Sequence, residues 1–130
     1  MAMLGTSARF RFTGDLDALA QAASGSLGSE LLGGFDPASP EDLANLKFGG
    51  ALGGFSAVTA RGSMRLLWIV LEQGEDAAGQ VVSDVVANAL SFGMFGGGKE
   101  QVWAERMAEV PGAVRVEWPR MGALTGMKFI

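Results

Sequence analysis

Residues 64–71 read MRLLWIVL, and this segment is the most hydrophobic in the chain. Its apolar side chains occupy both odd and even positions, so a strand formed here buries both of its faces. Residues 56–61 predict a partner strand, and Gly62-Ser63 between the two suits a tight hairpin turn. The segment therefore predicts a hairpin whose second strand lies at the centre of a sheet.

Alternating patterns on either side of this hairpin predict half-buried strands. Residues 9–12 read RFRF, which places both phenylalanines on one face and both arginines on the other. Residues 114–118 read VRVEW, so their apolar side chains are expected to point inward, and Pro119 ends this strand or confines it to an edge. Residues 124–130 resemble a final strand.

Helices are predicted where apolar residues recur at spacings of three and four. Asp15 is placed to cap a helix that runs towards Leu31 and weakens near residues 24–29, which include two glycines. A serine and a proline predict a short helix over residues 39–47. The valines of residues 74–91 form a broad apolar stripe that favours a long helix.

Residues 99–110 predict a further helix, which Pro111-Gly112 ends. On this pattern Val102, Met107 and Val110 face inward, and Trp103 flanks them. The order of elements predicts one α+β domain over residues 1–130 with a ferredoxin-like split β-α-β sheet. Four to five mostly antiparallel strands are expected, with the helices packed on one face.

The composition narrows the chemistry that the chain can perform. It has no cysteine, histidine or tyrosine, so thiolate nucleophiles, imidazole bases and the common zinc ligands are missing. We therefore expect no enzyme and assign no catalytic, cofactor-binding or metal-binding residue. Acidic residues between Asp15 and Asp42, and from Glu72 to Asp84, are interpreted mainly as helix-start anions.

The charge and hydropathy of the chain bear on its partners. A net charge of −4 argues against a general nucleic-acid binder. The longest unbroken apolar run, residues 66–71, is too short to span a bilayer, so no membrane insertion is expected. The predicted location is the cytoplasm, or a particle assembled there.

Residues 93–99 read GMFGGGK and match the spacing of a phosphate-binding loop as far as its lysine. Glu100 stands where a serine or threonine would bind magnesium, and its charge opposes a phosphate. The segment is interpreted as a connector between two helices, without a nucleotide.

Arg9, Arg11 and Arg115 form a candidate anion-binding face, with Arg61 or Arg65 beside them, if their strands are neighbours. The alternative interpretation is a solvated face of mixed charge in which Glu117 pairs with an arginine across strands.

The chain is more apolar than a soluble monomer of its size usually is, since 48% of its residues are hydrophobic and 18% are charged. Large apolar side chains also stand in or beside glycine-rich segments, where they suit insertion into a neighbouring subunit or fold back over the sheet. These candidate interaction residues are Phe48, Phe55, Phe92, Met94 and Phe95.

The sequence thus predicts a non-catalytic structural or interaction subunit of a homo-oligomer or larger protein assembly, such as a viral particle or an injection apparatus. The expected partners are further copies of the chain or other protein subunits. The alternative is a small-molecule or anion-binding regulatory domain, with its ligand between the sheet and residues 93–98.

Overall fold

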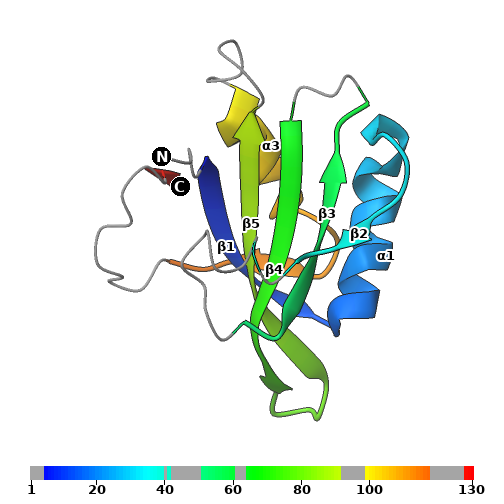
Figure 1. Cartoon of the computed structure of the whole chain (residues 1–130). Helices are drawn as coiled ribbons and strands as arrows, with labels where there is room; N and C mark the ends of the chain where they lie inside the picture. The colour runs from blue at the N-terminus through cyan, green and yellow to red at the C-terminus, as the bar shows by residue number, and fades with distance from the viewer. Residues whose placement is uncertain (1–4, 40, 42–50, 61–63, 92–98, 118–127) are drawn as a thin grey trace.

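The computed structural model describes residues 5–39, 41, 51–60, 64–91, 99–117 and 128–130. Its strands and helices follow one another along the chain as shown in Figure 1: β1 (Thr6–Thr13), α1 (Leu16–Leu27), the 3-10 helix η1 (Gly28–Glu30), β2 (Asp36–Pro37), β3 (Gly53–Val58), β4 (Met64–Glu75), β5 (Val81–Ser91), α3 (Lys99–Met107), β6 (Ala113–Arg115) and β7 (Lys128–Phe129).

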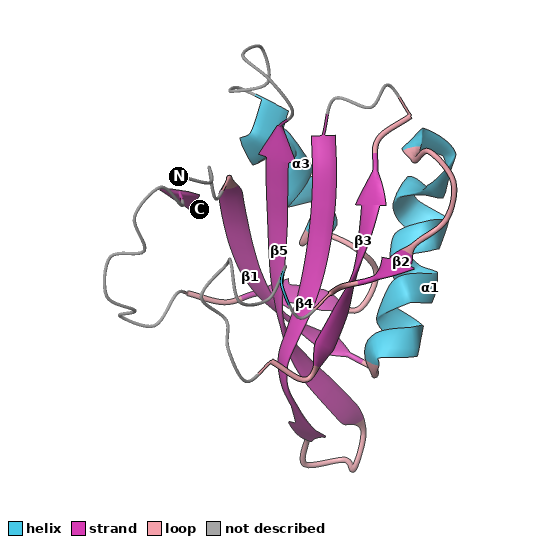
Figure 2. Ribbon diagram, in the orientation of Figure 1, coloured by secondary structure: helices cyan, strands magenta, loops and turns pink. Residues whose placement is uncertain are grey.

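The strands form one sheet in the order β2-β3-β4-β5-β1-β6, with every neighbouring pair antiparallel. The short β7 runs parallel to β1. Figure 2 shows α1 beside β3 and α3 behind β5. The predicted α+β class is confirmed, with both helices contributing to the core on one face of the sheet.

The central strand is β4, as the hydrophobic segment predicts. On the helix-covered face, Leu66, Trp68 and Val70 are buried, while Leu67 and Ile69 are buried on the opposite face. β3 and β5 flank β4 on its two sides, so the backbone of this apolar segment is hydrogen-bonded at both edges. Burial on both faces explains why apolar residues of both parities occur here.

β1 confirms the alternation at residues 9–12. Phe10 and Phe12 are buried against the helices, and the register places Arg9 and Arg11 on the other face. Helix α1 begins as expected, because the side chain of Asp15 accepts a hydrogen bond from the Ala18 backbone N–H at 2.9 Å. It ends at Leu27, within the predicted weak stretch.

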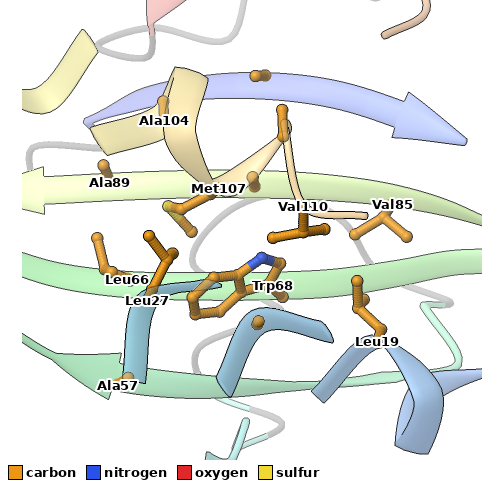
Figure 3. Close-up of a cluster of buried hydrophobic side chains, with 14 of the residues drawn as sticks. Leu19, Leu27, Ala57, Leu66, Trp68, Val85, Ala89, Ala104, Met107 and Val110 are labelled. Atoms are coloured by element: carbon orange, nitrogen blue, oxygen red, sulfur yellow. The ribbon is translucent and has the colours of Figure 1, made fainter. Parts of the chain in front are cut away.

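The core lies between the sheet and the two helices. Figure 3 shows Trp68 surrounded by Leu27 of α1, Met107 of α3 and Val110 after it, with Val85 of β5 close by. Met107 and Val110 therefore face inward as predicted.

The predicted long helix over residues 74–91 is wrong. β4 continues to Glu75, and β5 returns beside it as a strand. Asp76 makes the tight connection, because its carboxylate accepts the backbone N–H groups of Ala78 and Gln80, both at 2.9 Å. Four β-branched valines favour a strand, and pairing with β4 and β1 outweighs the helical spacing of the apolar residues.

Residues 53–55 extend the predicted partner strand at its start, because Gly53 and Gly54 of β3 pair with Val70 and Ile69. Two smaller expectations are corrected. Val102 is 54% exposed, although an inward position was expected. The inward position predicted for Val114 is wrong as well, since it is 66% exposed on β6. Most of the helix predicted at residues 39–47 lies outside the described residues.

No helix within the described ranges combines the length and the hydrophobicity that a bilayer span requires.

Candidate functional site

A cleft of about 550 Å³ opens at one end of the sheet, between η1, the chain that follows β3, and α3. Residues 29–30, Thr59 and Ala60 line it from the first two segments, and Lys99, Val102 and Trp103 line it from α3. Its volume falls in the usual range for small-molecule sites, about 300–1,000 Å³. This cleft is the principal candidate site in the described part of the chain.

Helical spacing places the α3 residues of the cleft together. Lys99, Val102, Trp103 and Arg106 are separated by three or four positions, so they share one face of the helix. An adjacent side of α3 carries Ala104 and Met107 into the core. The helix is thus held by its apolar side while this mixed face remains available to the cleft.

An ion pair ties this face of α3 to η1. Arg106 Nη1 donates to Glu30 Oε1 at 3.0 Å, and Arg106 Nη2 donates to Glu30 Oε2. The hydrogen bond lowers the pKa of Glu30 below its ordinary value and raises the pKa of Arg106. The Arg106 guanidinium also lies over the Trp103 ring, 4.6 Å from its centroid.

The opposing wall is joined to η1 through the backbone. The N–H of Ala60 donates to the carbonyl of Glu30 at 2.8 Å, and Leu31 forms a bridge with Thr59. Glu30 therefore connects two walls of the cleft, by its side chain to α3 and by its backbone to the end of β3.

The lysine of the candidate phosphate loop is the first residue of α3. Lys99 is exposed and forms no ion pair within the described residues, whereas Glu100 is 8% exposed. The Glu100 carboxylate accepts the backbone N–H of Ser91 at 3.3 Å. It therefore connects the start of α3 to the end of β5, which opposes a phosphate at that place. Gly93–Gly98 lie outside the described residues.

The proposed arginine face is not assembled as expected. Arg115 is opposite Phe10 in the register, so it lies on the other side of the sheet from Arg9 and Arg11. Arg115 donates to the carbonyl of Ile130 at 2.7 Å.

Arg9 is neutralised by a carboxylate of the neighbouring strand. Arg9 Nε donates to Asp84 Oδ1 at 2.8 Å, and Nη2 donates to Asp84 Oδ2. This hydrogen bond raises the pKa of Arg9. Arg11 also faces Asp84 across the strands, so the face is one of mixed charge, with Asp84 and not Glu117 as the acid that pairs with Arg9. Arg61 lies outside the described residues.

The candidate interaction residues fall in two groups. Phe55 lies in β3, is 5% exposed, and stacks on Trp68 with 5.0 Å between the ring centroids. This burial agrees with the interpretation in which the side chain packs on the sheet. The others, Phe48, Phe92, Met94 and Phe95, lie outside the described residues.

Sequence reasoning missed the cleft, although its signal is present at residues 99–106. There a lysine, a tryptophan and an arginine recur at spacings of three and four, which places them on one face of the predicted helix. Within the described residues, no group of three or more acidic side chains is arranged to hold a metal ion.

Comparison with protein-family models, with curated proteins and with solved structures found no significant match for this chain.

Proposed function

We propose that the protein is a non-catalytic interaction subunit that associates with further copies of itself, or with other subunits of an assembly, through the edges of its sheet. The observation that carries this proposal is the exposure of large aliphatic side chains at both edges. Val114 of β6 is 66% exposed, and Leu32 is 62% exposed.

Both residues lie on edge segments of the sheet. Leu32 donates its N–H to the carbonyl of Val58 at 2.7 Å, so it runs along the outer side of β3. Val114 belongs to β6, at the other end of the strand order. Within the described residues, no further strand pairs outside β2 or β6. Edge backbone with exposed aliphatic side chains offers hydrogen bonds and apolar area to another chain.

The connectivity supports a ferredoxin-like interpretation of the fold. β4 is parallel to β1 with β5 between them, and α1 lies between β1 and β4 in the chain. β5 and β6 are likewise parallel with β1 between them, and α3 connects them. Two split β-α-β units of this kind make up a ferredoxin-like sheet, to which β2 and β3 add an edge.

Mass measurement tests the proposed association. Native mass spectrometry and light scattering at micromolar concentration are expected to give a multiple of 13.5 kDa for the wild-type chain. Val114→Asp should reduce the mass towards one chain, because a charge at the edge opposes pairing. Val102→Asp is the matched control, since Val102 is a similarly exposed valine in the cleft.

A wild-type monomer that captures no partner subunit in a pull-down would contradict the proposal. Equal loss of association in Val102→Asp and Val114→Asp would contradict the assignment to the sheet edge.

A ligand-binding regulatory domain is the second candidate function, and the cleft beside α3 favours it. An aromatic ring and a lysine without an ion-pair partner in the described residues both line this cleft.

A further inference from the structure

We propose that the cleft between η1, the end of β3 and α3 binds a flat aromatic monoanion, such as an aromatic carboxylate. Lys99 would bind the anionic group, and the Trp103 ring would stack on the aromatic body. This inference goes beyond the association role and rests on the second candidate function.

Trp103 supplies an aromatic surface that is held in place. The Arg106 guanidinium lies over the ring, and Arg106 is itself fixed by two hydrogen bonds to Glu30. The half-buried Trp103 lines the cleft, so the ring is expected to keep its position whether or not a ligand is bound. A ring that is already ordered loses little conformational freedom when a flat molecule stacks on it.

Lys99 determines the sign of the ligand's charge. Lys99 and Arg106 are cationic and Glu30 is anionic, so these three groups carry one net positive charge, whereas the whole chain carries −4. Glu30 already pairs with Arg106, which leaves the Lys99 ammonium as the cation without a carboxylate partner in the described residues. An anion is therefore the complementary ligand.

The ligand's size and charge number follow from the other lining groups. Lys99 and Trp103 are four positions apart on α3, so their side chains are neighbours and suit a molecule whose acid group is attached to its ring. Glu30 lines the same cleft and its carboxylate is neutralised by Arg106, so a single positive charge, that of Lys99, is left for a ligand to balance. These groups favour a monoanion and disfavour a polyphosphate.

Isothermal titration calorimetry of the full chain with 2-naphthoate and its neutral analogue 2-naphthamide tests the proposal. Saturable binding of 2-naphthoate at one site is expected, with weaker binding of 2-naphthamide. Lys99→Met should weaken 2-naphthoate binding about tenfold or more and leave 2-naphthamide within about twofold, because it removes a charge-assisted hydrogen bond.

Two further variants locate the site. Trp103→Ala, checked for its fold by circular dichroism, should weaken binding of both compounds. Arg11→Met is the matched control, because it removes a cation from a strand outside the cleft, and it should leave both affinities unchanged.

The outcomes separate this inference from the functions on which it builds. If 2-naphthamide binds as tightly as 2-naphthoate and only Trp103→Ala weakens it, the anion class is overturned while ligand binding in the cleft stands. If neither compound binds at millimolar concentration, both the ligand class and this use of the cleft are overturned. The association state is measured separately by mass and is decided by neither result.

Discussion

The surroundings of Trp68 and Trp103 show how one residue type serves two purposes in this fold. Trp68 is fully buried in β4, stacks on Phe55, and meets Phe35 edge-on with 5.6 Å between the ring centroids. Trp103 is half-buried on α3, lies under the Arg106 guanidinium, and lines the cleft.

The two indoles also differ in their polar contacts. The Nε1–H of Trp68 is buried and has no hydrogen-bond partner within the described residues. Beside Trp103, the Arg106 guanidinium is paired with the Glu30 carboxylate. In the core, the apolar contacts of the Trp68 ring outweigh the cost of burying its unpaired N–H donor. In the cleft, charged side chains surround the accessible ring of Trp103. We therefore expect Trp68 to contribute mainly to the stability of the fold and Trp103 mainly to ligand binding.

The largest expected effect separates the two residues by stability. Trp68→Ala should lower the free energy of unfolding by about 3–5 kcal/mol, since it leaves a large cavity in the core. Trp103→Ala should lower it by about 1 kcal/mol or less, because the side chain is half-exposed. Urea unfolding followed by circular dichroism measures both values. Equal losses of unfolding free energy would contradict the different roles assigned to the two tryptophans.

A smaller effect is expected when only the indole N–H and part of the ring are removed. Trp68→Phe should cost about 1–2 kcal/mol, clearly less than Trp68→Ala, because the loss of the unpaired buried N–H offsets part of the lost packing. The same unfolding experiment measures it. A cost as large as that of Trp68→Ala would mean that the Nε1–H has a partner in the folded protein.

The smallest expected effect is the pH dependence of the stability that the Glu30–Arg106 ion pair contributes. The pKa of Glu30 is lower in the folded protein than its ordinary value of about 4.3. Its stabilising contribution is therefore present above that ordinary value and is lost as the pH falls through the lower, folded-state pKa. Glu30→Gln removes this contribution.

Urea midpoints between about pH 6 and pH 2.5 measure this effect. The wild-type chain should lose slightly more stability on acidification than Glu30→Gln does. Identical pH profiles would contradict a stabilising role for the Glu30–Arg106 pair.

Local patterns predicted much of the fold because their physical causes are local. The alternation at residues 9–12, the cap at Asp15 and the two-sided hydrophobicity of residues 64–71 all have the expected structure. β5 was mistaken for a helix, since Val81, Val85 and Val86 fit helical spacing as well as a buried strand. Only pairing with β1 and β4 distinguishes these two structures.

The candidate site was less predictable than the fold. Arg9 and Arg115 were expected on one face, but the register of β6 places them on opposite sides of the sheet. A shift of one residue in register reverses which side chains are exposed. β6 has only three residues, which are too few for its sequence to specify the register. The cleft requires η1 and the end of β3 to meet α3, and these segments are distant along the chain.

Composition and local patterns were sufficient to predict a central apolar strand, a capped first helix, an α+β class and a chain without imidazole or thiol chemistry. These properties depend on composition and on neighbours a few positions away. Three further features became clear only from the folded chain: residues 81–91 form a strand, Arg9 and Arg115 lie on opposite faces of the sheet, and Glu30 pairs with Arg106. Those outcomes depend on strand register and on contacts between distant residues, and no local pattern encodes them.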